Sequence, residues 1–276
     1  KDFNDLEDQL EEYGIVTYKD SVYLKYTLMC EKYVSKMIMN RIEEDCYMLD
    51  TIYSDDIEMS DQQKLAVDRS LKNKFHIITG GAGTGKTTII KEIVENIIYN
   101  GKIPLIVSFT GKAIVRLKET LGDKYLTMTM DLYLNYTDKP KFDHLIIDES
   151  SMVATELLYK FLKATEKFDN YSITMVGDVN QLQPVSWGNM FEEIINTKKI
   201  KITYLTHNYR LFITPNVKNM ILINANGMLE SNDNLFKFES GGNFNLINGN
   251  TDIVSMLYEK LLKGNNISDR DITVLC

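Results

Sequence analysis

The sequence lacks any apolar run long enough to cross a membrane. None of its 276 residues belongs to a stretch approaching the roughly 20 uninterrupted apolar positions that a bilayer-spanning helix needs. The N-terminus is acidic, whereas a secretory signal opens with a basic region followed by an apolar one. A composition that is 44% hydrophobic and 25% charged is typical of a globular chain and excludes wholesale disorder. We therefore expect a cytoplasmic protein with no membrane partner.

Cysteine is also scarce, and its spacing excludes two classes of small scaffold. The three cysteines are Cys30, Cys46 and Cys276, with no CxxC pair and no neighbouring histidine. Neither a zinc site nor a disulfide framework follows from such spacing. We expect buried, reduced thiols.

Positive charge is in deficit, with a formal net charge of -8. The first 60 residues hold 15 acidic and 6 basic side chains, so the remaining 216 hold 24 acidic and 25 basic ones. The acidity therefore belongs to an N-terminal appendage, and the nearly neutral body does not exclude a nucleic-acid partner.

The two ends of the chain suggest a fragment. The first residue is Lys1 and not methionine, and the last, Cys276, directly follows the apolar run 272–275. We expect that further residues follow in the parent protein.

Apolar spacing predicts helices at both ends of the chain. Residues 21–49 place apolar groups at mixed three- and four-residue steps, which is typical of an amphipathic helix or helix pair. Ser60 offers an N-cap to a helix that continues to about Asn73. Residues 214–229 also read as a helix, and 230–250 as a polar connection with one strand at most.

The middle of the chain alternates strand and helix patterns. Apolar strand-like runs lie at 75–79, 103–109, 144–148 and 171–177, and helical patterns lie at 86–99, 112–121 and 155–166. Such alternation predicts an α/β fold with a mainly parallel sheet covered by helices on both faces.

A glycine-rich segment follows the first of these strands. Residues 80–87 read GGAGTGKT and fit the pattern G-x-x-x-x-G-K-[ST], with a strand before it and a helix after it. In this pattern backbone N–H groups face the phosphates, the lysine reaches the β and γ phosphates, and the final hydroxyl binds Mg²⁺. The sequence therefore predicts a P-loop NTPase that binds ATP and Mg²⁺. The candidate contacts are Gly81, Ala82, Gly83, Thr84, Gly85, Lys86, Thr87 and Thr88.

A strand that ends in two carboxylates supplies the second half of such a site. Residues 144–150 read HLIIDES, so Asp148 and Glu149 stand at the end of an apolar strand. We expect Asp148 to bind Mg²⁺ together with Thr87, and Glu149 to orient or deprotonate the attacking water.

Five further segments, in chain order, resemble the motifs of superfamily 1 helicases, most closely those of the RecD-like branch. The resemblance extends from about residue 20 to residue 276 and includes a helical N-terminal region. Residues 60–67, SDQQKLAV, resemble the Q motif, and the resemblance implies that Gln63 contacts the adenine edge.

Two segments resemble the family's contacts to a single strand. Residues 109–117, FTGKAIVRL, resemble a segment that holds the strand backbone, which implies contacts from Thr110, Gly111 and Lys112. The family often has Thr-x-His where this chain has Thr129-Met130-Asp131, so the histidine is replaced by Asp131 and only Thr129 is retained as a candidate.

The segment 177–185, GDVNQLQPV, resembles the motif whose glutamine senses the γ-phosphate, which makes Gln181 a candidate. Trp187 lies just beyond it. As the single tryptophan of the chain, it either stacks on a base or belongs to the core, and the sequence leaves both open.

The segment 205–210, LTHNYR, resembles the motif whose arginine reaches the γ-phosphate, which implies a catalytic role for Arg210 beside Lys86. The two late motifs of the second RecA-like domain are not in this sequence. The resemblance therefore implies a fragment that binds nucleotide but hydrolyses and unwinds poorly by itself.

Taken with the motifs, the resemblance implies three regions: an acidic, mainly helical region at 1–58, a RecA-like ATPase domain at 59–230, and the start of an incomplete second RecA-like domain at 231–276. It implies an ATP-dependent DNA helicase that moves 5′ to 3′ on single-stranded DNA, with RNA less favoured. Expected partners are the missing C-terminal motor domain and a protein bound through the N-terminal region. A nucleoid or a viral replication site would fit this function. A P-loop switch ATPase without translocation and an RNA helicase of the same superfamily stay open.

Overall fold

The computed structural model describes residues 10, 12–19, 21–44, 49–53, 58–168, 170–210, 212–214, 217–230, 237–241 and 243–244. The chain divides into two compact units, Lys1–Tyr209 and Arg210–Cys276. The boundary between the two units, after Tyr209, lies before the domain boundary that the sequence predicted at residue 230. Of the cysteines, Cys30 is a buried free thiol, whereas Cys46 and Cys276 lie outside the described residues.

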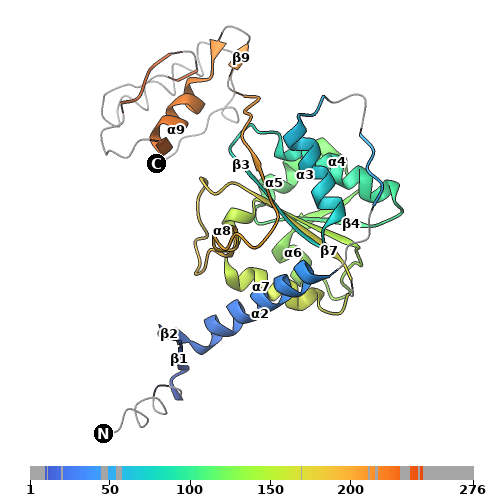
Figure 1. Cartoon of the computed structure of the whole chain (residues 1–276), viewed down its shortest axis with the longest axis vertical. Coiled ribbons are helices and arrows are strands. Elements are labelled where there is room, and N and C mark those ends of the chain that lie inside the picture. The colour runs from blue at the N-terminus through green and yellow to red at the C-terminus, as the bar shows by residue number, and fades with distance from the viewer. Residues whose placement is uncertain are drawn as a thin grey trace. The chain divides into compact units, whose positions relative to one another are not determined.

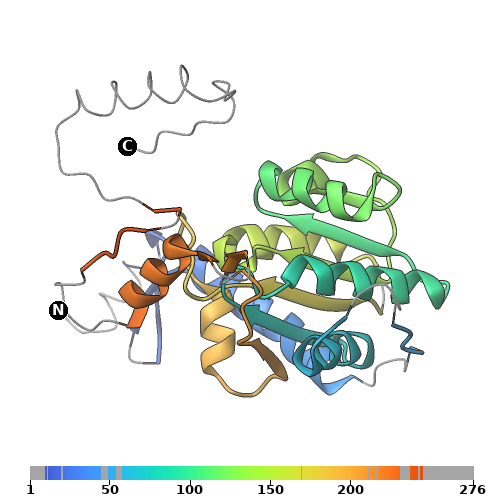
Figure 2. The same ribbon diagram turned by 90° about the horizontal axis from the view of Figure 1, so that it is seen from above.

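A six-stranded sheet forms the centre of the first unit (Figure 1). The strands pair in the order β5-β4-β6-β7-β3-β8, and all neighbours are parallel. Their bounds are β3 Phe75–Gly80, β4 Pro104–Ser108, β5 Leu126–Thr129, β6 His144–Asp148, β7 Ser172–Gly177 and β8 Ile202–Leu205. In Figure 2 the green strands lie toward one edge of this sheet and the blue-green β3 toward the other.

Helices cover both faces of the sheet. One face carries α3 Asp61–Lys72, α4 Lys86–Tyr99 and α5 Gly111–Leu121. The other carries α2 Lys25–Glu43, α6 Met130–Asn135, the short 3-10 helix η1 Ser150–Met152, α7 Thr155–Thr165 and α8 Met190–Asn196. The predicted α/β fold, with a parallel sheet between two helical layers, is confirmed.

Successive strand residues enter two separate cores. Ile77 of β3 packs with Phe161 of α7 in one cluster, and its neighbour Ile78 packs with Ile93 of α4 in the other. Because side chains alternate along a strand, a strand covered on both faces is apolar at nearly every position. This explains the uninterrupted apolar runs in the sequence.

The N-terminal region begins with a hairpin and continues as one helix. β1 Ile15–Tyr18 pairs antiparallel with β2 Ser21–Leu24, so the prediction of helix from residue 21 was wrong for the first four positions. Valine and tyrosine favour extended backbone there, and β1 supplies a pairing partner. The helix α2 then packs on α7, and its Val34 and Ile38 join the core. This helix is therefore built into the first compact unit.

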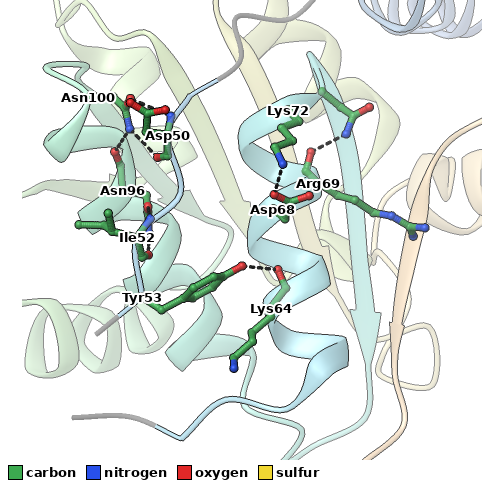
Figure 3. A network of polar contacts seen from close by, with 10 residues as sticks. Asp50, Ile52, Tyr53, Lys64, Asp68, Arg69, Lys72, Asn96 and Asn100 are labelled. Atoms are coloured by element: carbon green, nitrogen blue, oxygen red, sulfur yellow. Dashed lines mark hydrogen bonds and ion pairs between the residues drawn. The ribbon is translucent and has the colours of Figure 1, made fainter. Parts of the chain in front are cut away.

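The segment 49–53, between α2 and α3, is pinned to the end of α4 (Figure 3). The Asn100 side chain bonds both backbone groups of Asp50, at 3.0 and 2.9 Å, and the Asn96 side chain bonds both of Ile52, at 2.7 and 2.8 Å. The Tyr53 hydroxyl donates to the carbonyl of Lys64 on α3 at 3.2 Å. Paired amide bonds of this kind satisfy the backbone of an irregular segment and fix it to the helix that follows the glycine-rich loop.

The second unit contains β9 Phe212–Thr214, β10 Val217–Lys218 and α9 Met220–Glu230. The predicted helix over 214–229 therefore begins later, at residue 220, because β9 and β10 pair as a short hairpin. The predicted connection at 230–250 lies largely outside the described residues. No helix in the described ranges is long and apolar enough to span a bilayer.

Two histidines lie buried in the first unit's sheet. The ring nitrogens of His76 pair with the hydroxyls of Ser70 at 2.8 Å and Thr203 at 3.0 Å, and Nε2 of His144 pairs with that of Thr174 at 2.9 Å. Burial lowers the pKa of each histidine to about 3. Both rings are therefore neutral in the folded protein.

We expect these histidines to make the first unit acid-sensitive. The unfolded chain takes up protons near the ordinary pKa of 6.5, whereas the folded pKa is about 3, so stabilisation present above 6.5 is lost progressively as pH falls toward 3. Substituting His144→Gln keeps an amide able to bond Thr174 and should reduce the slope of unfolding free energy against pH in this window. Denaturant unfolding at a series of pH values measures it, and an unchanged slope would contradict the assignment.

Candidate functional site

The carboxyl ends of the six parallel strands meet at one edge of the sheet. Ser108 of β4 pairs with Asp148 of β6, and Thr79 of β3 pairs with Gly177 of β7. The residues that end the strands are Gly80, Ser108, Thr129, Asp148, Gly177 and Leu205. The predicted site residues of the first unit lie at these ends or in the segments that follow them, apart from Gln63 on α3. Ligands of open α/β sheets bind at this edge.

The glycine-rich loop between β3 and α4 leaves the start of α4 without a side-chain cap. Gly85, the N-cap residue, has a φ of 85° and Gly83 has a φ of 84°, a region that glycine adopts without steric cost. The half-buried Thr87 and Thr88 lie in the first turn, whose N–H groups have no partner within the helix. An open helix start in this loop suits a phosphate group.

Lys86 folds back onto this loop. Its ammonium group donates to the carbonyl oxygens of Gly80 at 2.5 Å and Gly81 at 3.1 Å. Burial lowers the pKa of Lys86, and nearby carboxylates oppose this shift, in decreasing order Asp178, Glu149 and Asp148. The lysine and the two predicted acidic residues therefore share one electrostatic environment.

The two carboxylates after β6 differ in environment. Asp148 is 8% exposed, and burial followed by the charge of Glu149 raises its pKa to about 6. Glu149 has a φ of 52°, and one of its carboxylate oxygens is buried without a hydrogen-bond partner in the described structure. A left-handed backbone at a residue with a side chain costs about 1–3 kcal/mol and is typical of functional sites. A buried carboxylate oxygen without a partner fits a site that receives a metal ion or water.

Gln63 joins α3 to the loop. The predicted cap is present: Ser60 accepts from the backbone of Gln63 at 3.4 Å, while the Gln63 side chain accepts from the backbone of Ser60 at 3.0 Å. The amide of Gln63 also donates to the carbonyl of Thr84 at 3.3 Å, and its oxygen accepts from the Tyr209 hydroxyl at 3.1 Å. Gln63 is thus buried against the loop.

The segment after β8 holds the same loop, and the sequence did not reveal these contacts. Asn208 donates its side-chain amide to the carbonyl of Ala82 at 2.7 Å, and the backbone N–H of Tyr209 donates to that of Gly83 at 2.9 Å. Gln62 accepts from the backbone of Thr206 at 3.0 Å. No local pattern in the sequence pairs residues so far apart in the chain.

Asp178 also lies near the site, although the sequence did not identify it as a site residue. It is 4% exposed, and its carboxylate accepts from the backbone N–H of Asn180 at 3.0 Å. Its carbonyl accepts from the backbone N–H of Gln181 at 3.1 Å, which starts the loop after β7. The half-exposed Gln181 therefore lies on a loop whose first turn is fixed by Asp178.

The predicted strand contacts lie at neighbouring strand ends. The Thr110 hydroxyl accepts from the N–H of Ala113 and caps α5, and the Thr129 hydroxyl caps α6 in the same way, each at 3.2 Å. Gly111 and Lys112 are exposed. Capping uses each hydroxyl as an acceptor and leaves its proton available to a phosphate.

Trp187 packs against the N-terminal helix. Its ring meets the Tyr26 ring edge to face, with centroids 6.4 Å apart, and it is half-buried. Arg210 belongs to the second unit, where its carbonyl accepts from Asn219 at 3.1 Å. Arg210 therefore belongs to a different compact unit from the glycine-rich loop and the two acids.

The parallel sheet, the uncapped helix start after the glycine-rich loop and a lysine that shares the electrostatic environment of nearby carboxylates define a P-loop nucleotide-binding protein. The AAA domain family matches residues 58–240, so the chain belongs to that family. The predicted resemblance to the RecD-like branch of superfamily 1 is confirmed by the chain's relatives.

Three relatives show the extent of the similarity. The uncharacterized protein MJ1519 of Methanocaldococcus jannaschii is 39% identical over 49% of this chain and 14% of its own length. The RecBCD enzyme subunit RecD of Buchnera aphidicola is 31% identical over 65% of this chain and 35% of its own length. The ATP-dependent RecD2 DNA helicase of Deinococcus radiodurans is 28% identical over 62% and 26%. The chain thus spans 14% to 35% of the length of these relatives.

The loop geometry predicts opposite outcomes for two neighbouring glycines. A Cβ on Gly85 would meet the side-chain nitrogen of Gln63 at 2.3 Å and would occupy a left-handed backbone, whereas a Cβ on Gly81 would meet nothing within 4 Å. We expect Gly85→Ala to lower the unfolding free energy by about 1–3 kcal/mol and Gly81→Ala to leave it within about 1 kcal/mol. Denaturant unfolding without nucleotide measures both. Equal losses would refute the proposed role of Gly85.

Proposed function

We propose that this chain is the motor core of a RecD-like DNA helicase, which couples ATP hydrolysis to movement along single-stranded DNA. The observation that carries this proposal is the shared sheet edge, where the phosphate loop, the buried acids and the strand-contact residues end adjacent parallel strands. The similarity to a protein named as an ATP-dependent DNA helicase supports it. A nucleotide switch that does not move along a nucleic acid would not need the strand-contact residues.

In this proposal the glycine-rich loop and the two carboxylates after β6 form the nucleotide site. Thr87 and Asp148 would hold Mg²⁺, which neutralises phosphate charge when bound. Lys86 would leave the carbonyls of Gly80 and Gly81 for the β and γ phosphates. Glu149, with its unpartnered buried oxygen, would orient the attacking water and accept its proton.

The remaining nucleotide contacts are proposed on either side of the phosphate loop. Gln63 would contact the adenine edge, Gln181 would sense the γ-phosphate, and Arg210 would stabilise the transferring group. Since Gln63 already bonds Thr84 and Tyr209, adenine contact would rearrange one of these bonds.

The strand site is proposed to lie beside the nucleotide site. Thr110 and Thr129 would donate hydroxyl protons to successive phosphates, and Lys112 would add a cation. Gln181 would link the two sites, because β7, which precedes its loop, lies between β3 and β6 in the sheet. Trp187 would stack on a base.

The direction of movement, the domain bounds, the slow hydrolysis and the protein partner are proposed from the family resemblance. Movement is proposed to be 5′ to 3′, with residues 59–230 forming the first motor domain and 231–276 opening the second. Hydrolysis would be slow in the chain alone, because the opposing domain's contacts are needed. The acidic region 1–58 would bind a protein partner.

The ATPase rate of the full-length protein, with and without single-stranded DNA or RNA at one fixed salt concentration, tests the proposal. Stimulation by DNA alone is expected. Stimulation by RNA alone would indicate an RNA helicase, and no stimulation by either would favour a switch ATPase.

Two substitutions separate binding from chemistry. We expect Lys86→Ala to weaken nucleotide binding by at least about tenfold, and Glu149→Gln to spare binding while lowering the hydrolysis rate by about 10²-fold or more, since the lysine holds phosphates and the glutamate moves a proton. Fluorescent-nucleotide titration and phosphate release measure the two effects. Lys91→Ala, which removes another lysine of α4, should change neither. Equal loss of binding in both site variants would refute this division of roles.

A further inference from the structure

A hollow of about 520 Å³ opens on the α7 side of the strand-end edge. Its apolar wall comprises Phe109, Leu134, Met152, Ala154, Leu157 and Val185. Val185 is 98% exposed, so this wall is not sealed by the protein's own core. A volume of this size admits a planar heterocycle, and the aromatic ring of Phe109 offers a surface for stacking.

The polar part of the hollow carries net negative charge. Two carboxylates, Asp131 and Glu156, and one ammonium group, Lys160, line it together with Ser186. Glu156 is already engaged, since it accepts from Lys160 at 2.7 Å and from the Tyr26 hydroxyl at 3.3 Å. Asp131 makes no hydrogen bond or ion pair within the described part of the chain. A phosphate would therefore be repelled, whereas a group that donates hydrogen bonds would find a ready acceptor.

The hollow is bordered by the proposed strand contacts. Phe109 directly precedes Thr110, Asp131 follows Thr129 by two residues, and Ser186 directly precedes Trp187. A strand whose phosphates lie on the two threonines would have its bases near the mouth of this hollow.

We propose that the hollow accepts a base of the bound strand and that Asp131 selects bases carrying an exocyclic amino group. This inference rests on the proposed function. A carboxylate can only accept hydrogen bonds, and the amino group of cytosine donates one, whereas the corresponding carbonyl of thymine or uracil is itself an acceptor. Adenine and guanine also carry amino groups. The hollow has this selectivity because residue 131 is an aspartate, whose carboxylate accepts hydrogen bonds and donates none.

The sharpest test compares oligo-dC with oligo-dU of equal length, because the two bases differ only along one edge: cytosine has an amino group at C4 and an unprotonated N3, whereas uracil has a carbonyl at C4 and a proton on N3. Fluorescence anisotropy would be measured with the full-length protein, at neutral pH and one fixed salt concentration. We expect oligo-dC to bind on the order of tenfold more tightly. Asp131→Asn should bring the two affinities to within about twofold, because a carboxamide can donate as well as accept.

Asp123→Asn is the matched control, since it removes one exposed carboxylate from the loop after α5 and leaves the hollow intact. It should preserve the preference for oligo-dC, and thermal melting should show that both variants stay folded. Equal binding of the two oligomers by the unsubstituted protein would overturn the role of Asp131. A preference for oligo-dC that persists in Asp131→Asn would do the same. Either result would leave strand binding itself intact. Absence of binding to either oligomer would instead contradict the proposed function itself.

Discussion

The parallel pairing of β3, β6 and β7 is the constraint on which the rest of this structure depends. Because β7 lies between the other two strands and all three run in one direction, the glycine-rich loop, Asp148 and the loop carrying Gln181 must emerge at the same edge. Burial of the two groups at this edge lowers the pKa of Lys86 and raises that of Asp148. Topology thus brings charged groups together that the chain separates widely.

The glycine-rich loop is held from both sides, and this links the nucleotide site to the rest of the chain. Gln63 on α3 and Tyr209 after β8 bond each other as well as the loop. Tyr209 is the last residue of the first unit, and Arg210 begins the second. A ligand that moves the carbonyls of Ala82 or Gly83 would therefore also disturb Asn208 and Tyr209, which lead into the second unit.

The sequence predicted those parts of the fold that depend on local pattern. Four of the strands, the helix after the loop and the Ser60 cap follow from apolar periodicity and capping chemistry, and they are present. The hairpin of β1 and β2 was not predicted. Its short strands are stabilised by pairing with each other, and apolar periodicity does not reveal such pairing. The bonds from Gln62 and Asn208, and the burial of Asp178, depend on long-range packing and have no local signal. The roles predicted for Gln63, Gln181 and Arg210 stay predictions.

Thermodynamic linkage between nucleotide and strand is the decisive test of a shared sheet edge, because coupling between two ligands must be reciprocal. The affinity of the full-length protein for a non-hydrolysable ATP analogue would be measured with and without saturating single-stranded DNA, and its affinity for DNA with and without the analogue. We predict that each ligand changes the affinity for the other by the same factor, of about fivefold or more. Two affinities that are each unaffected by the other ligand would contradict the account.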